Sequence, residues 1–274
     1  MLKQRVITAI ILLALFLSGL FLLPTLGWQL LITLVVMQGA VEWGNLSKFS
    51  GKLATIYWWV TLAMMGGLMW LGAGHALALQ AMSHVFFYAT SVVLWLIVVP
   101  FWLASGWQVR QPFLMALVGW AVLIPTGLAM MDLRDSSPWL LLGMMGLVWV
   151  ADIAAYFTGR KYGKRKLAPS ISPGKTWEGV MGAMAGVSIC IVVGFFFSGY
   201  LHWYKFLPTV LLAACCWVAL AVLGDLFESA IKRQAGVKDS GSLLPGHGGL
   251  LDRIDALTST LPLAALMLVL QKLP

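Results

Sequence analysis

Residues 53–109 read LATIYWWVTLAMMGGLMWLGAGHALALQAMSHVFFYATSVVLWLIVVPFWLASGWQV and contain no Lys, Arg, Asp or Glu. A membrane-spanning helix needs about 20 mostly apolar residues, so this stretch has room for two spans. The whole chain of 274 residues shares this character, because 61% of it is hydrophobic and only 10% is charged. Soluble domains carry about 25% charged residues. The composition excludes a soluble domain, a disordered chain and a disulfide-bonded secreted module, and it predicts an all-α polytopic integral membrane protein.

The chain contains nine apolar segments that could cross a bilayer as helices. The second is the weakest, because it is short and contains Gln29 and Gln38. We predict about nine transmembrane helices, at approximately 6–23, 26–41, 53–73, 78–103, 111–131, 138–159, 179–201, 206–227 and 255–271.

The basic residues indicate how these helices are oriented. The chain has 18 Lys and Arg against 10 Asp and Glu, a net charge of +8. Threading nine helices through a membrane leaves only Arg134, Lys205 and Lys272 on the side opposite the N-terminus, and the other 15 of the 18 basic residues share one side. By the positive-inside rule, that side is the cytoplasm. We expect a multi-pass protein of the cell (inner) membrane with a cytoplasmic N-terminus.

Polar residues divide the chain into two regions of one membrane-embedded unit. Residues 1–137, with helices one to five, are expected to be a transmembrane scaffold that offers a surface to another subunit. Residues 138–274, with helices six to nine and cytoplasmic loops at 159–179 and 228–255, are expected to be the catalytic region.

Asp152 lies inside the sixth predicted span, in the segment WVADIAAYFTGR. A carboxylate at the centre of a membrane helix costs ~2.5–3.5 kcal/mol on insertion scales, so such residues are usually functional or paired. We interpret Asp152 as a functional residue. The alternative is a structural ion pair with Arg160 or Lys161.

The loop that follows reads GRKYGKRKLAPSISPGKTWEG at 159–179. Its GKT sequence resembles part of a P-loop, but Pro169 stands where that motif needs a glycine. The side chains of Ser172, Lys175 and Thr176 are nevertheless suited to binding phosphate, because they offer a positive charge and hydroxyl donors. The basic run at the start of the loop needs no more explanation than attraction to anionic lipid headgroups.

The end of the eighth span, GDLFESAIKR, places four polar residues on one helical face. Asp225, Glu228, Ser229 and Lys232 follow one another at i, i+3, i+4 and i+7. The interpretation is a site that combines acidic and basic groups at the cytoplasmic end of this helix.

A glycine-rich loop then leads to Asp252 and Asp255 at the start of the last helix. Mg²⁺ is typically held by one or two carboxylates plus substrate phosphates, and nearby cations neutralise the remaining phosphate charge. We therefore predict a metal–phosphate site. The alternative is a salt-bridged loop, which would not need the glycines at 241, 246, 248 and 249.

Residues 229–255 match the pattern S-x-IKR-x4-KD-x-G-x2-LP-x-HGGL-x-DRID. This pattern resembles the signature of the phosphatidate cytidylyltransferase family, also called CDP-diacylglycerol synthases. The segments ISPGKTWEG and ADxxAYFxGR are also similar to that family, so the resemblance covers about 150–255 in detail.

The resemblance implies a nucleotidyltransferase that makes CDP-diacylglycerol and pyrophosphate from CTP and phosphatidate. It implies dependence on Mg²⁺, with room for a second, monovalent cation, and a homodimer that binds no nucleic acid. By resemblance, Asp225, Asp252, Lys232 and His247 are catalytic, and Asp225 and Asp252 are the metal carboxylates. The implied substrate-binding residues are Asp152, Ser172, Lys175, Thr176, Ser229, Arg233, Lys238, Asp239, Gly248, Gly249, Arg253 and Asp255.

Two other classes of protein compete with this interpretation. An ion-coupled transporter would explain carboxylates inside spans, but it predicts similar halves with polar groups near the midplane. A CDP-alcohol phosphotransferase or a polyprenyl-phosphate enzyme would share the lipid-phosphate chemistry. The former family carries a DG-x2-AR signature, which this sequence lacks.

Overall fold

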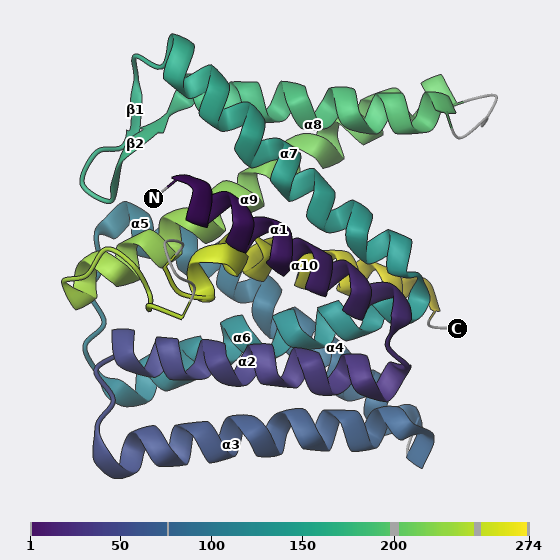
Figure 1. Ribbon diagram of the computed structural model, residues 1–274, viewed down its shortest axis with the longest axis vertical. Helices are drawn as coiled ribbons and strands as arrows, with labels where there is room; N and C mark the ends of the chain where they lie inside the picture. Colours follow the sequence, from purple (N-terminus) through teal and green to yellow (C-terminus); the bar gives the residue numbers. More distant parts are fainter. Residues whose placement is uncertain (1, 76, 198–202, 244–247, 273–274) are drawn as a thin grey trace.

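The computed structural model describes residues 2–75, 77–197, 203–243 and 248–272, and Figure 1 shows that most of them are helical. The α-helices are α1 (Leu2–Leu22), α2 (Thr25–Leu46), α3 (Gly51–Trp70), α4 (Leu77–Val93), α5 (Val99–Ser105), α6 (Pro112–Ser136), α7 (Pro138–Tyr162), α8 (Trp177–Phe197), α9 (Leu207–Ala235) and α10 (Leu251–Lys272). Two π-helical turns, Leu71–His75 and Leu94–Val98, extend α3 and join α4 to α5, and a 3₁₀ turn, Trp203–Phe206, precedes α9.

The predicted all-α polytopic membrane fold is confirmed. Within the described residues, eight helical segments are long and apolar enough to cross a membrane, and α1 adds a shorter apolar stretch, Thr8–Leu22. Each of the nine predicted segments corresponds to one of these helices. The weak second segment is a helix of 22 residues, Thr25–Leu46, which continues past its predicted end through Glu42. Cys190, Cys215 and Cys216 are all free.

Helix α10 lies in the middle of the bundle, between elements from both halves of the chain (Figure 1). It contacts α9 and also α4 and α6. Leu257, Leu261 and Ala265 on this helix are at most 2% exposed. The last helix of the predicted catalytic region thus forms part of the core of the predicted scaffold. The division of the chain near residue 137 stays a prediction.

Helices α7 and α8 pack closely because small residues line their contact. The glycines at 182 and 186 of α8 face Thr158 and Ala154 of α7, and a Cβ atom added at either glycine would overlap those side chains. Small residues at such positions let two membrane helices approach backbone to backbone. Together α7 and α8 form an arm at one edge of the bundle, opposite α3 (Figure 1).

The loop between α7 and α8 contains two short strands, which the sequence analysis did not predict. Strand β1 (Lys166–Ala168) pairs antiparallel with β2 (Ser172–Thr176), so that Lys166 lies opposite Thr176. The SPGKT segment is therefore a strand of a hairpin, in agreement with the rejection of a P-loop.

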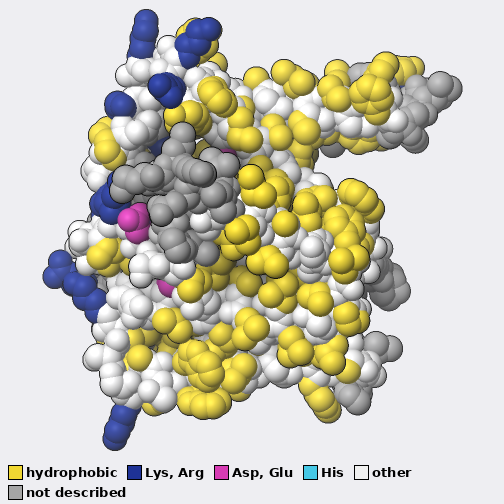
Figure 2. Space-filling view, viewed as in Figure 1, with side chains coloured by type: hydrophobic (Ala, Val, Ile, Leu, Met, Phe, Trp, Pro, Cys, Tyr) yellow, Lys and Arg dark blue, Asp and Glu magenta, His cyan; other side chains and the backbone are white. Residues whose placement is uncertain are grey.

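Charged side chains gather at one end of the helices. The hairpin, the connection between α2 and α3 and the C-terminal end of α9 all lie at this end in Figure 1. On the face drawn in Figure 2, the Lys and Arg side chains lie along the same end, and hydrophobic side chains cover the rest. The structure thus has one basic end, as the positions of the basic residues in the sequence predict.

We expect Gly182→Ala to destabilise the protein by about 1–3 kcal/mol, because the added methyl group would overpack the contact with Thr158. Gly194→Ala is the matched control on the same helix, since nothing lies within 4 Å of a Cβ at that position. Thermal unfolding in detergent should show a lower midpoint for Gly182→Ala only. Equal midpoints in the two variants would contradict the close packing of α7 and α8.

Candidate active site

A cleft of about 510 Å³ opens between α7, α8, α9 and the hairpin. Its polar lining includes Asp152, Arg160, Ser172, Lys175 and Asp225. The rest of its wall is largely apolar and is contributed by Ala151, Ala155, Val180, Ala183, Val218, Ala221 and Val222. The cleft therefore combines charged groups with a surface that suits hydrocarbon.

An ion pair joins the hairpin to α9 at this cleft. Lys175 Nζ lies 2.5 Å from Asp225 Oδ2. On the other carboxylate oxygen, Ser229 Oγ donates a hydrogen bond of 3.3 Å to Asp225 Oδ1. Three of the predicted site residues, from two segments far apart in sequence, are thus brought into direct contact.

Asp152 faces the same cleft, and its carboxylate forms no hydrogen bond or ion pair with the residues that the structure describes. It lies within electrostatic range of Asp225, Lys175 and Arg253. Arg160, its alternative structural partner, instead donates a hydrogen bond of 3.0 Å to the Tyr156 hydroxyl. The structure therefore does not contain the Asp152–Arg160 ion pair that the purely structural interpretation of Asp152 proposed.

Contacts between the start of α8 and the preceding loop fix the position of the hairpin. The Glu178 carboxylate accepts hydrogen bonds from the backbone N–H groups of Lys164, at 3.1 Å, and Arg165, at 3.2 Å. Thr176 caps α8 directly, since its Oγ1 accepts a hydrogen bond of 3.2 Å from Gly179 N. Lys175, which lies between these contacts in sequence, is thereby held in the lining of the cleft.

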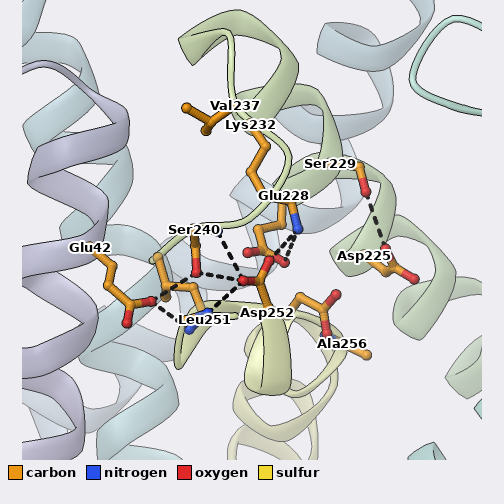
Figure 3. Close-up of polar contacts among 12 residues, drawn as sticks. Glu42, Asp225, Glu228, Ser229, Lys232, Val237, Ser240, Leu251, Asp252 and Ala256 are labelled. Atoms are coloured by element: carbon orange, nitrogen blue, oxygen red, sulfur yellow. Dashed lines mark hydrogen bonds and ion pairs between the residues drawn. The ribbon is translucent and has the colours of Figure 1, made fainter. Parts of the chain in front are cut away.

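A second polar cluster lies where α9 and α10 meet (Figure 3). Lys232 Nζ is 2.5 Å from Asp252 Oδ1 and 3.4 Å from Glu228 Oε2. Asp252 Oδ2 accepts hydrogen bonds from Ser240 N at 2.9 Å and Gly249 N at 2.8 Å. Both oxygens of the Asp252 carboxylate are therefore occupied, and they connect α9, the following loop and the start of α10.

The four residues expected on one face of α9 do form one polar row. Ser229 contacts Asp225, and Lys232 contacts Glu228. Glu228 is buried at 6% exposure, and neither of its oxygens receives a hydrogen bond from the described part of the chain. Its carboxylate is instead paired with the Lys232 ammonium group, at 3.4 Å.

Glu42 belongs to this cluster, and the sequence analysis missed it. This residue of α2 is only 2% exposed. Its carboxylate accepts hydrogen bonds from Leu250 N at 2.9 Å, Leu251 N at 2.9 Å and Ser240 Oγ at 2.8 Å. The second span was predicted to end at residue 41, so the argument that singled out Asp152, a carboxylate within a span, did not extend to Glu42.

The other predicted residues lie around these two clusters. Arg233 Nε donates a weak hydrogen bond of 3.4 Å to Ile171 O, and the residue lines a smaller cavity of about 200 Å³ with Trp102 and Trp107. Lys238, Asp239 and Arg253 are exposed. Gly248 has a φ of 84°, and Gly249 is buried. Asp255 is half-buried, and its Oδ1 accepts a hydrogen bond of 2.8 Å from Ala256 N. His247 lies outside the described residues.

The carboxylates divide between the two clusters. Asp152 and Asp225 line the cleft, and Asp252 and Glu228 surround Lys232. In the described ranges, no group of three His, Cys, Asp or Glu side chains is placed to hold a metal ion. One or two carboxylates that face a phosphate-sized space are what Mg²⁺ uses with nucleotide substrates, and Asp152 and Asp225 meet that description.

Comparisons with known proteins show which proteins this chain resembles. The family model described as the cytidylyltransferase family matches residues 3–271. A protein of Pseudomonas aeruginosa named phosphatidate cytidylyltransferase is 38% identical, in an alignment that covers 98% of this chain and 97% of the relative. Relatives with the same name from Haemophilus influenzae and Brucella suis are 36% and 33% identical, over 96% and 94% of this chain and 96% and 90% of their own lengths.

We expect Glu178→Ala to loosen the hairpin, because Lys164 and Arg165 lose the acceptor of their backbone hydrogen bonds. Hydrogen bonds to a charged group are stronger than those between neutral groups, so local opening of the hairpin should increase severalfold. Limited trypsin digestion followed by mass spectrometry would measure cleavage at residues 164–166. Cleavage at Lys48, between α2 and α3, serves as the internal control and should not change. Unchanged cleavage at the hairpin would show that Glu178 does not anchor it.

Proposed function

The chain belongs to the cytidylyltransferase family, and we propose that it makes CDP-diacylglycerol and pyrophosphate from CTP and phosphatidate. The resemblance found in its signature is thereby confirmed at the level of the family. The protein is an enzyme of the nucleotidyltransferase class with multiple membrane spans. The substrates, the chemical mechanism and the orientation in the membrane belong to the proposal.

The cleft between α7, α8 and α9 is the observation that carries this proposal. Its lining contains the Lys175–Asp225 pair, and much of the remainder consists of Ala and Val side chains. Phosphatidate has an anionic headgroup attached to hydrocarbon chains, so its two parts match the two parts of this lining. A wholly water-soluble pair of substrates would not need the apolar wall.

The proposed reaction needs no nucleophile from the protein. A phosphate oxygen of phosphatidate attacks the α-phosphorus of CTP in line, and the bond from that phosphorus to the β-phosphate oxygen breaks to release pyrophosphate. Both reactants are anionic, so the barrier includes the approach of like charges. Catalysis then consists of positioning and charge neutralisation. Lys175 and Arg160 line the cleft and can supply positive charge to the phosphates.

We propose that Mg²⁺ assists this reaction. Asp225 would hold the ion, and Asp152 faces the same cleft with no hydrogen bond or ion pair to the described residues. When bound, Mg²⁺ would neutralise charge on the triphosphate and on the departing pyrophosphate. Asp252 stays a predicted ligand, although Lys232, Ser240 and Gly249 occupy its oxygens here. A second, monovalent cation also stays a prediction.

The basic end of the molecule supports a cytoplasmic active site at the inner membrane. Both polar clusters lie near this end, where CTP from the cytoplasm and lipid headgroups from the inner leaflet can meet. The positive-inside rule is the physical reason for this orientation. A homodimer, implied by the resemblance alone, completes the proposal.

The direct test is an assay of the protein purified in detergent. With CTP, phosphatidate and Mg²⁺, we expect formation of CDP-diacylglycerol and pyrophosphate in equal amounts, detected by chromatography and a coupled pyrophosphate assay. Omission of any of the three components should abolish both products. A protein that forms neither product but moves solutes across proteoliposome membranes would instead be a transporter.

Asp225→Asn and Asp252→Asn should each lower kcat/KM at least about 100-fold, equivalent to about 2.7 kcal/mol in barrier. The first change removes the charge that faces the cleft, and the second removes the partner of Lys232. Asp135→Asn is the matched control, because this exposed carboxylate lies at the opposite end of α6 from the basic end. Activity near that of the unmodified protein in either variant would remove that carboxylate from the catalytic machinery.

A further inference from the structure

Glu42 joins the first half of the chain to the second cluster of polar residues. It comes from α2, and its partner Ser240 is 198 residues away in sequence. Figure 3 shows its side chain reaching from α2 toward Ser240 and Leu251. Within the described part of the chain, its four hydrogen-bond donors are Leu250 N, Leu251 N, Ser240 Oγ and Gln38 Nε2, and all are uncharged groups.

Two of these donors belong to the N-terminal end of α10. Helix N-termini expose backbone N–H groups that carry partial positive charge, so a buried carboxylate there is well matched. Both oxygens of Glu42 are used in this way, since Leu250 N bonds to Oε1 and Leu251 N bonds to Oε2. The position of α10 relative to α2 is fixed as a result.

The hydroxyl of Ser240 lies between Glu42 and Asp252. Its Oγ is 2.8 Å from Glu42 Oε2 and 3.0 Å from Asp252 Oδ2. Asp252 in turn holds Lys232 through its other oxygen. A continuous polar chain therefore runs from Glu42 through Ser240 and Asp252 to Lys232.

Two glycines of the signature make room for this chain of contacts. A Cβ at Gly241 would lie 3.0 Å from Glu42 Oε1. A Cβ at Gly249 would overlap both Ser240 Oγ and Glu42 Oε2. The loop can approach the carboxylate this closely only because these positions lack side chains.

We propose that Glu42 is a positioning residue of the active site. It holds Ser240 and the start of α10 so that Asp252 and Lys232 keep their relative geometry while substrates bind. This inference rests on the proposed function for its catalytic readout. It goes beyond that function because it assigns an active-site role to α2, in the part of the chain that was expected to be only scaffold.

The test compares Glu42→Gln, Ser240→Ala and the double variant in the full-length protein. Glutamine keeps the size of Glu42, but its amide NH2 group replaces one acceptor facing the α10 N–H groups. We expect kcat/KM for CTP to fall at least about 10-fold in each single variant, with KM rising. The double variant should be about as impaired as the worse single variant, because both changes break one chain of contacts.

The rise in KM separates positioning from loss of folded protein, which would lower kcat alone. Asp132→Asn is the matched control, since Asp132 is also a carboxylate within a helix, paired with His84 Nδ1 at 2.8 Å and Tyr88 Oη at 2.7 Å at the other end of α6. It should lower the unfolding temperature and leave KM unchanged. If Glu42→Gln does not fold, Ser240→Ala decides the question alone.

Hydrogen exchange provides a readout that does not depend on activity. Backbone amides at 248–253 should exchange faster in Glu42→Gln than in the unmodified protein, and amides of the hairpin should not change. An unmodified protein without transferase activity would refute the proposed function, and exchange would still decide the role of Glu42. Kinetic constants within twofold of the unmodified protein in both single variants, or unchanged exchange at 248–253, would overturn the inference.

Discussion

The carboxylate of Asp252 joins α9, the loop after it and the start of α10. Its two oxygens receive the ammonium group of Lys232 and the backbone N–H groups of Ser240 and Gly249. A charge inside a bundle of apolar helices is costly unless it is paired and fully hydrogen-bonded. The chain meets this constraint by bringing α9, the loop after it and the start of α10 together around one side chain.

The same constraint connects the two polar clusters through α9. Helix α9 carries Asp225 on the side of the cleft and Lys232 beside Asp252. Since these residues are two turns apart on one helix, a displacement of α9 would move side chains of both clusters together. The hairpin closes the first cluster through Lys175, and α2 closes the second through Glu42.

Much of this arrangement could be predicted from local patterns. The nine apolar segments, the polar face of α9 and the acidic start of α10 each depend on residues near one another in sequence, and all three are observed. The hairpin was missed because its strands have three and five residues, too short for a periodic signal. Glu42 was missed because its partners are about 200 residues away.

Composition and the length of hydrocarbon that a helix must cross are enough to predict the membrane class, the helical spans and the basic end of this protein. Its 229–255 signature also determined the family. Tertiary packing brings Lys175 to Asp225, places Asp152 in the same cleft, and sets Glu42 against the start of α10. These contacts depend on how helices pack across the bundle, and no local pattern encodes which buried charge will find which donor.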